Sequence, residues 1–189
     1  MEHEIDICDR QESVAVDLTR LRAAMLTALK SERVRSAVLS VSIVSNDEIH
    51  DLNRRHLNHD YPTDVISFQL DFSENSGADF EPNAEDSDPT NTDMPSEDGG
   101  VSDSDGVRAA GMMIEGEIIA SAEMAESMAA EGQWSTQDEL TLYVVHGLLH
   151  ICGYDDTSDD EKRIMRSRER TIMAAIGLKA VYAEDAAGP

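Results

Sequence analysis

Two histidines and two aspartates lie close together in one short segment and could bind a metal ion. His146 and His150 are four residues apart in an apolar stretch, so on a helix their side chains project from one face, one turn apart. Two imidazoles placed in this way can coordinate one divalent cation. Gly153 then allows the chain to reverse, so that Asp155 or Asp156 can fold back as a third ligand. The segment therefore predicts a metal centre of two histidines and one carboxylate.

The residue after the first histidine argues against a zinc protease. Such enzymes carry a glutamate at this position, where it serves as general base. This chain has Gly147 instead, so this turn of the helix offers no carboxylate beside a metal-bound water. One alternative for the histidine pair is a hydrogen-bonded role in the core. Another is an iron oxygenase with two histidines and one carboxylate, but nothing in the chain suggests the cosubstrate pocket that this chemistry needs.

The elements that must position these residues alternate in an order typical of an α+β domain. Apolar periodicity and capping residues predict helices over residues 14–30, 46–57, 122–131, 136–151 and 158–176. Runs of alternating or β-branched residues predict strands over residues 38–44, 65–70 and 113–121. The helix with the histidines is apolar around nearly its whole circumference, so we expect it to be buried. We predict one α+β domain in which helices pack on a small mixed β-sheet, with the metal site on a buried helix.

Negative charge is concentrated in one part of the chain. The 189 residues include 39 Asp+Glu and 15 Lys+Arg, which gives a formal net charge of −24. Residues 71–107 contain twelve of the acidic residues and no Lys or Arg. Such a stretch cannot bury enough apolar surface to offset the entropy of ordering. We therefore predict one domain over 1–182, interrupted by a disordered acidic insertion at 71–107 and followed by a loose tail at 183–189.

Composition also restricts the setting and the partners. The acidic balance argues against a protein that coats DNA or membranes, and we expect neither as a partner. No stretch approaches 18 consecutive apolar residues, and the acidic start lacks the apolar segment of a secretory signal. Cys8 and Cys152 do not make a disulfide framework, so we expect a reducing, cytoplasmic setting.

The segment from His146 to Asp156 resembles the signature of the YbeY family, bacterial rRNA maturation factors described as metal-dependent endoribonucleases. That signature reads H-G-x-L-H-x-x-G-Y-D-H, and the chain matches every named position except the last. Two further motifs occur in the family's order. The sequence PTDVISF at 62–68 is similar to PTDVLSF, and GEI at 116–118 is similar to GDI. The resemblance covers about residues 35–70 and 112–178.

This resemblance implies a single α+β domain, one zinc ion per chain and action on ribosomal RNA during ribosome assembly. Carried over to this chain, the metal ligands are His146, His150 and Asp156. The family's third ligand is usually histidine. A carboxylate at that position leaves the site with one positive charge less, so we expect a less acidic metal-bound water. The arginine that many members carry upstream of PTDV falls on Leu57 here.

We therefore expect a zinc-dependent endoribonuclease that cuts single-stranded RNA during rRNA maturation, including the 3′ end of 16S RNA. Its partners would be ribosomal RNA and precursors of the small ribosomal subunit. Arg54, Arg55, Arg163 and Arg166 are candidate phosphate contacts. The alternative for the arginines of the last helix is a solvated face paired with Asp160, Glu161 and Glu169. No residue suggests itself as general base. The alternative is a non-catalytic assembly factor in which the metal stabilises the fold.

Overall fold

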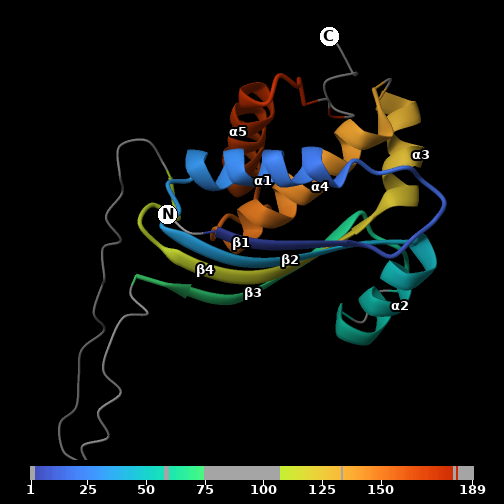
Figure 1. The fold of residues 1–189 in the computed structure, drawn as a ribbon, viewed down its shortest axis with the longest axis horizontal. Coiled ribbons are helices and arrows are strands. Elements are labelled where there is room, and N and C mark those ends of the chain that lie inside the picture. The colour runs from blue at the N-terminus through green and yellow to red at the C-terminus, as the bar shows by residue number, and fades with distance from the viewer. Residues whose placement is uncertain (1–2, 58–59, 75–106, 133, 181, 183–189) are drawn as a thin grey trace, which may run out of the picture.

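A four-stranded sheet forms the base of the fold in a computed structural model of the chain (Figure 1). The structure describes residues 3–57, 60–74, 107–132, 134–180 and 182. The strands are β1 (His3–Asp9), β2 (Ser36–Val44), β3 (Val65–Ser73) and β4 (Met113–Ser121), in the spatial order β1-β2-β4-β3. Strands β1, β2 and β4 run parallel, whereas β3 pairs antiparallel with β4. The predicted mixed sheet is thus confirmed, and β3 is one of its two edge strands.

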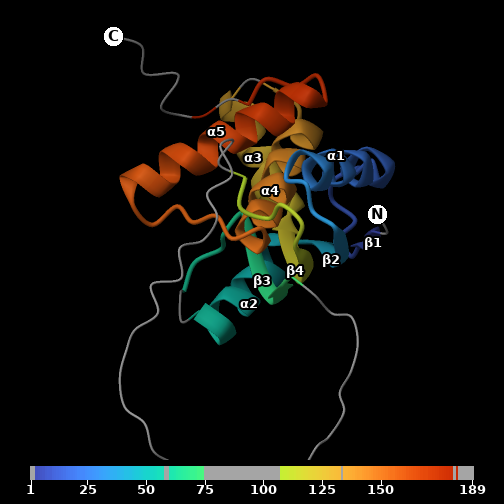
Figure 2. The ribbon, with the colours of Figure 1, turned by 90° about the vertical axis from the view of Figure 1, so that its left-hand side faces the viewer.

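Helices cover the two faces of this sheet unequally. The five helices are α1 (Leu18–Ser31), α2 (Asn46–Leu57), α3 (Ala122–Gly132), α4 (Thr136–Ile151) and α5 (Asp159–Ala175). Figures 1 and 2 show α1, α3, α4 and α5 on one side of the sheet and α2 on the other. None of the described helices is both long and apolar enough to cross a membrane. Because α1, α3 and α5 lie on the same side of the sheet as α4, the helix with the histidines is enclosed between the sheet and these neighbouring helices.

Burial of α4 follows from its sequence. Its N-cap is Ser135, whose hydroxyl accepts the backbone N–H of Asp138, as the sequence suggested. Almost every side chain of the helix is buried, including Leu140, Leu148 and Leu149. An α-helix that is apolar around its circumference must be covered on all sides. The prediction of a buried helix is confirmed, and its two histidines lie where α4 faces the edge of the sheet near β3.

Two glycines allow α4 to approach the sheet closely. A Cβ atom on Gly116 of β4 would lie 2.6 Å from Cδ1 of Ile151 and 2.8 Å from the backbone oxygen of Phe68. A Cβ atom on Gly147 of α4 would lie 3.1 Å from Cγ2 of Ile118 and 3.2 Å from a methyl group of Val65. Gly147, which occupies the position of the protease glutamate, is therefore explained by packing of α4 against the sheet.

A buried ion pair between Glu32 and Arg168 supports the turn after α4. Gly153 adopts φ +87°, a left-handed conformation that ends the helix without steric cost. The next residue, Tyr154, donates its hydroxyl to Oε2 of Glu32 at 2.7 Å. Glu32 is 0% exposed, and its Oε1 accepts hydrogen bonds from Nη2 and Nε of Arg168 at 2.7 and 2.9 Å. Residues from α1, α5 and the turn thus fix the chain immediately before the two aspartates.

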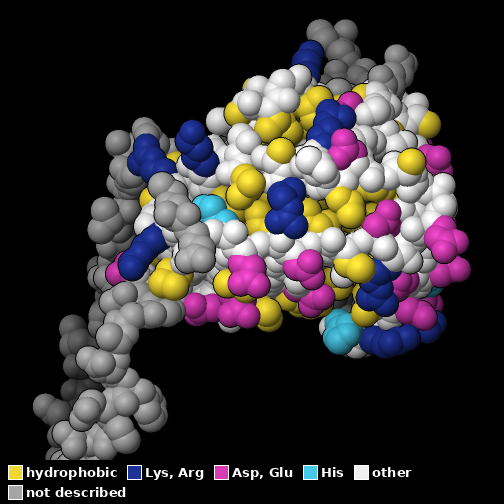
Figure 3. All heavy atoms as spheres, in the orientation of Figure 1, with side chains coloured by type: hydrophobic (Ala, Val, Ile, Leu, Met, Phe, Trp, Pro, Cys, Tyr) yellow, Lys and Arg dark blue, Asp and Glu magenta, His cyan; other side chains and the backbone are white. Residues whose placement is uncertain are grey.

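The face of the sheet opposite α4 carries exposed acids. Glu4, Asp6 and Glu115 are exposed on the outward face of β1 and β4, and Val38 lies between Glu4 and Glu115 in the strand register. Figure 3 shows acidic side chains gathered along the lower part of the molecule, where the sheet lies. The part of this face that β1 and β4 form therefore repels polyanions, and an RNA partner is favoured elsewhere on the surface.

One strand and two boundaries differ between the sequence-based prediction and the structure. Strand β1 was not expected: Ile5 and Ile7 alternate with acidic residues, but this pattern is short, and the strand is held by its parallel pairing with β2. Helix α1 begins at Leu18 rather than at residue 14, since Asp17 caps it by accepting the N–H of Arg20. The expected insertion at 71–107 begins inside β3, and its residues 75–106 lie outside the described part of the chain, as do residues 183–189.

The close approach at Gly116 predicts a loss of stability on adding a methyl group. Gly116→Ala is expected to lower the free energy of unfolding by about 1–3 kcal/mol, because the backbone oxygen of Phe68 cannot move aside freely. Urea denaturation measures the effect. The matched control, Ser40→Ala on the exposed face of β2, should change stability by less than about 0.5 kcal/mol. Equal stabilities of the two variants would contradict the packing described here.

The buried ion pair of Glu32 and Arg168 predicts a larger loss of stability than the close approach at Gly116 does. Arg168→Met leaves the carboxylate of Glu32 buried without its cation and is expected to destabilise the protein by about 3–5 kcal/mol. Thermal or urea unfolding provides the measurement. Arg163→Met on the same helix is the control, because Arg163 pairs with Asp160 on the open surface and should contribute at most about 1 kcal/mol. An Arg168 variant as stable as this control would exclude a supporting role for the pair.

Candidate metal centre

Three predicted ligands come together at the C-terminal end of α4. One ligand atom each from His146, His150 and Asp156 lies within 4.8 Å of the other two. The two Nε2 atoms are 3.1 Å apart, and each histidine Nε2 lies 3.8 Å from an oxygen of Asp156. Nitrogens about 2.0–2.1 Å from a tetrahedral zinc lie about 3.3 Å from each other, so this spacing fits a shared ion.

The outer nitrogen of each ring supports the same conclusion. Nδ1 of His146 lies 2.6 Å from Oε1 of Glu169, and Nδ1 of His150 lies 3.0 Å from the backbone oxygen of Tyr154. Both partners are acceptors, so each Nδ1 carries a proton, and the lone pair of a neutral ring is on Nε2. Two lone pairs that face each other at 3.1 Å repel unless a proton or a metal cation lies between them. The donor set therefore fits a divalent metal ion.

Of the two adjacent aspartates, Asp156 faces the histidines. The carboxylate of Asp155 instead accepts the backbone N–H of Asp156 at 2.7 Å and of Thr157 at 3.2 Å. It also accepts the hydroxyl of Thr157 at 3.0 Å. These bonds lower the pKa of Asp155 and fix the turn. Asp155 thus shapes the loop, and Asp156 presents its oxygens to the rings.

Burial and neighbouring charge act oppositely on the two rings. Burial lowers the pKa of His146, but the hydrogen bond to Glu169 and the charges of Glu169 and Asp156 outweigh it and raise the pKa above its usual value. Burial also lowers the pKa of His150, and the nearby His146 lowers it further. Burial raises the pKa of Glu169, yet its bonds to His146 and Tyr182 bring it below the ordinary value. The directions of these two pKa shifts both favour the charged pair of a protonated His146 and an ionised Glu169.

The ligands open into a hollow along the free edge of β3. This hollow has a volume of about 510 Å³, and its lining combines the three ligands with residues 64–69. Gln69 donates from Nε2 to the backbone oxygen of Ile151 at 2.8 Å, which ties the strand to the end of α4. Asp64, on the same wall, accepts the N–H of Val65 and the hydroxyl of Thr63. An extended polymer could therefore lie along β3 and reach the ligand atoms.

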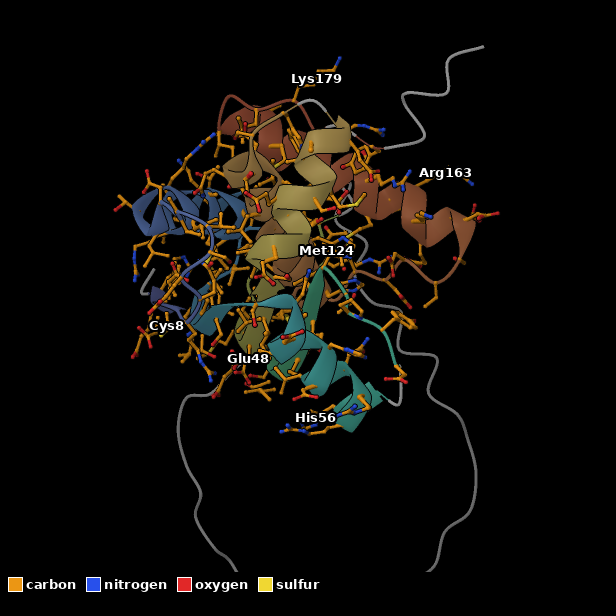
Figure 4. The ribbon with its side chains drawn as sticks, turned by 90° about the vertical axis from the view of Figure 1, so that its right-hand side faces the viewer. Cys8, Glu48, His56, Met124, Arg163 and Lys179 are labelled. Atoms are coloured by element: carbon orange, nitrogen blue, oxygen red, sulfur yellow. The ribbon has the colours of Figure 1, made fainter. Side chains whose placement is uncertain are left out.

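The four arginines expected to contact phosphate do not line this hollow. Arg54 and Arg55 of α2 pair with Asp51 at 2.7 and 3.5 Å, and Arg55 lines a second hollow of about 810 Å³ between α2 and the sheet. Arg163 pairs with Asp160 and, in Figure 4, projects away from the body of the molecule. The guanidinium of Arg166 lies 4.7 Å from the ring centroid of Tyr182. The two pairs of arginines thus lie on separate helices, and none of the four lines the hollow.

Three residues near the centre were not assigned a role from sequence. Glu169 was grouped with the solvated face of α5, whereas it is 3% exposed and shares the buried side with Met165 and Ile172. The apolar spacing of these neighbours was the available signal. Asp64 was present only within a motif, and Tyr182 lies beyond the last expected helix. Cys152, by contrast, is fully buried, as expected of a core residue.

Comparisons with known proteins show the family to which the chain belongs. The chain matches the family model described as Endoribonuclease YbeY over residues 6–177. A relative from Bacillus subtilis named Endoribonuclease YbeY is 33% identical, over 93% of this chain and 96% of the relative. Another of the same name, from Rhodopirellula baltica, is 34% identical over 88% of this chain and 68% of its own. The solution structure of TM1509 from Thermotoga maritima shares the fold, with a TM-score of 0.51 at 20% identity, over 92% of this chain and 91% of its own. The chain therefore belongs to the Endoribonuclease YbeY family.

Proposed function

We propose that this chain is a metal-dependent endoribonuclease that cuts single-stranded RNA in the maturation of ribosomal RNA, including the 3′ end of 16S RNA. The observation that carries the proposal is the convergence of two imidazole nitrogens and one carboxylate at the edge of an open hollow. Zinc is the proposed ion, because a set of two histidines and one carboxylate suits it. The names of the relatives support RNA as the substrate class.

His146, His150 and Asp156 would hold the ion, and the hollow along β3 would receive the RNA strand. When bound, the ion would supply Lewis-acid chemistry at a phosphate oxygen or a water molecule. Glu169 and the backbone of Tyr154 keep both rings turned with Nε2 toward the hollow. Asp64 contributes a further carboxylate to the same wall, where it can accept a proton through water.

The proposed phosphate contacts lie farther along the strand. Arg54 and Arg55 on α2 and Arg163 and Arg166 on α5 do not line the hollow, so they would bind phosphates on either side of the cut rather than at it. Phosphate contacts of this kind position a nucleic acid without reading its sequence. Their positions support a substrate several nucleotides long.

Replacement of the ligands tests the proposal. His146→Ala, His150→Ala and Asp156→Ala are each expected to lose bound metal and to reduce cleavage of a defined single-stranded RNA to background, because three ligands hold one ion. Metal content by mass spectrometry and gel-based cleavage provide the readouts, with Asp159→Ala, at the exposed start of α5, as the control. Cleavage that persists in metal-free variants would overturn the proposal. Metal bound by a wild-type protein that associates with small-subunit precursors but cuts no RNA would favour the non-catalytic assembly factor.

The carboxylate ligand predicts a shift in the pH dependence of cleavage. Asp156→His replaces an anionic ligand by a neutral one and leaves more positive charge on the ion, which favours loss of a proton from bound water. The rise of the cleavage rate with pH is therefore expected at lower pH in this variant than in the wild type. Single-turnover rates across a pH series measure the shift. Identical profiles would show that the charge of the third ligand does not control the reaction.

A further inference from the structure

The two histidines of the metal centre differ in the partner of their outer nitrogen. His150 uses a neutral backbone oxygen, that of Tyr154, at 3.0 Å. His146 uses a carboxylate, that of Glu169, at 2.6 Å. A charged acceptor makes a shorter and stronger hydrogen bond than a neutral one. The orientation and proton position of His146 therefore depend on a side chain, which a substitution can remove.

Glu169 is held so that its carboxylate cannot turn away. The residue is 3% exposed, on the buried side of α5. Its Oε1 faces Nδ1 of His146 at 2.6 Å, and its Oε2 accepts the hydroxyl of Tyr182 at 2.5 Å. Both oxygens of the carboxylate are thus engaged by a defined partner, which fixes the plane of the group as well as its position.

Tyr182 is itself fixed by α5, although it lies beyond the end of that helix. Its ring centroid lies 4.7 Å from the guanidinium carbon of Arg166 and 4.8 Å from that of Arg170. Cation–π contacts of this kind hold an aromatic ring in one place while its hydroxyl remains available as a donor. The segment after α5 is thereby attached to the residue that orients His146.

We propose that Tyr182 and Glu169 are positioning residues that together set the tautomer and orientation of His146. Glu169 accepts the proton on Nδ1, so that Nε2 presents a lone pair to the hollow, and Tyr182 keeps Glu169 in the orientation that does so. This inference rests on the proposed metal site. It assigns to Tyr182 and Glu169 a share of the metal affinity, although neither residue would touch the ion.

The proton position can be tested without any metal. Long-range proton–nitrogen spectra at alkaline pH, where the ring is neutral, report which nitrogen of His146 carries the proton. The wild type is expected to show the Nδ1–H form. Glu169→Leu, which removes both acceptor oxygens at similar size, is expected to shift His146 toward the Nε2–H form. Glu169→Gln keeps one acceptor oxygen and should retain the wild-type form. An unchanged tautomer in Glu169→Leu would overturn the assignment.

The metal affinity is the second readout. Competition with a chelator is expected to show zinc binding about 10–100-fold weaker in Glu169→Leu than in the wild type, and an intermediate loss in Glu169→Gln. The control is Glu126→Leu on the exposed side of α3, which should bind zinc as the wild type does. Wild-type affinity in Glu169→Leu would refute the role of Glu169. Failure of the wild type itself to bind zinc would refute the proposed function, while the tautomer spectra still decide what Glu169 does.

Tyr182 is tested by a double-mutant cycle. Tyr182→Phe keeps the ring between the arginines but removes the donor, and it should weaken zinc binding by less than about tenfold. Tyr61→Phe, on an exposed tyrosine, is the control. Because Tyr182 acts through Glu169, its substitution should cause no further loss in the Glu169→Leu background. Equal losses in both backgrounds would show that the two residues act independently and would overturn this part of the inference.

Discussion

Two imidazole rings on a buried helix need a polar partner for each of their four nitrogens, and this requirement organises the centre of the molecule. The outer nitrogens are paired with Glu169 and with the backbone oxygen of Tyr154. The inner nitrogens face each other at 3.1 Å, beside Asp156. Two lone pairs opposed at this distance repel each other, so the arrangement favours a proton or a cation between them.

The same requirement determines where the neighbouring elements lie. Helix α5 must cross α4 at the level of His146 for Glu169 to reach Nδ1. The turn after Gly153 must bring a backbone oxygen to His150, and the buried Glu32 holds Tyr154 for this purpose. The contacts of Glu169 with His146 and of Glu32 with Tyr154 join residues far apart in sequence, and the close packing of α4 on the sheet helps to make them simultaneous. The packing that forms the fold therefore also forms the candidate site.

Local sequence patterns were sufficient to predict the helices and strands but not the contacts between them. Five helices and three strands were predicted with ends within a few residues of the observed ones, because their apolar periodicity and caps are local signals. Strand β1 was missed since its one buried face leaves only Ile5 and Ile7 as signal. Glu169 was taken for a solvated residue, because the partner that explains its burial, His146, lies 23 positions earlier in the chain. Sequence spacing specifies which residues share a helix face, whereas the helix that covers this face is determined by tertiary packing.

Charge around the centre explains how an acidic protein could act on an anionic polymer. Asp156, Glu169 and Asp64 lie near the proposed site, and their three negative charges more than balance a divalent ion, which would therefore attract phosphate only at short range. Longer-range attraction must come from arginines, and Arg54 and Arg163 are each paired with an exposed acid. Exposed ion pairs contribute about 0–1 kcal/mol, so a phosphate can replace the acid at little cost. RNA binding would then be weak, dependent on ionic strength and reliant on several phosphates at once, which suits a substrate presented by a larger particle better than a free oligonucleotide.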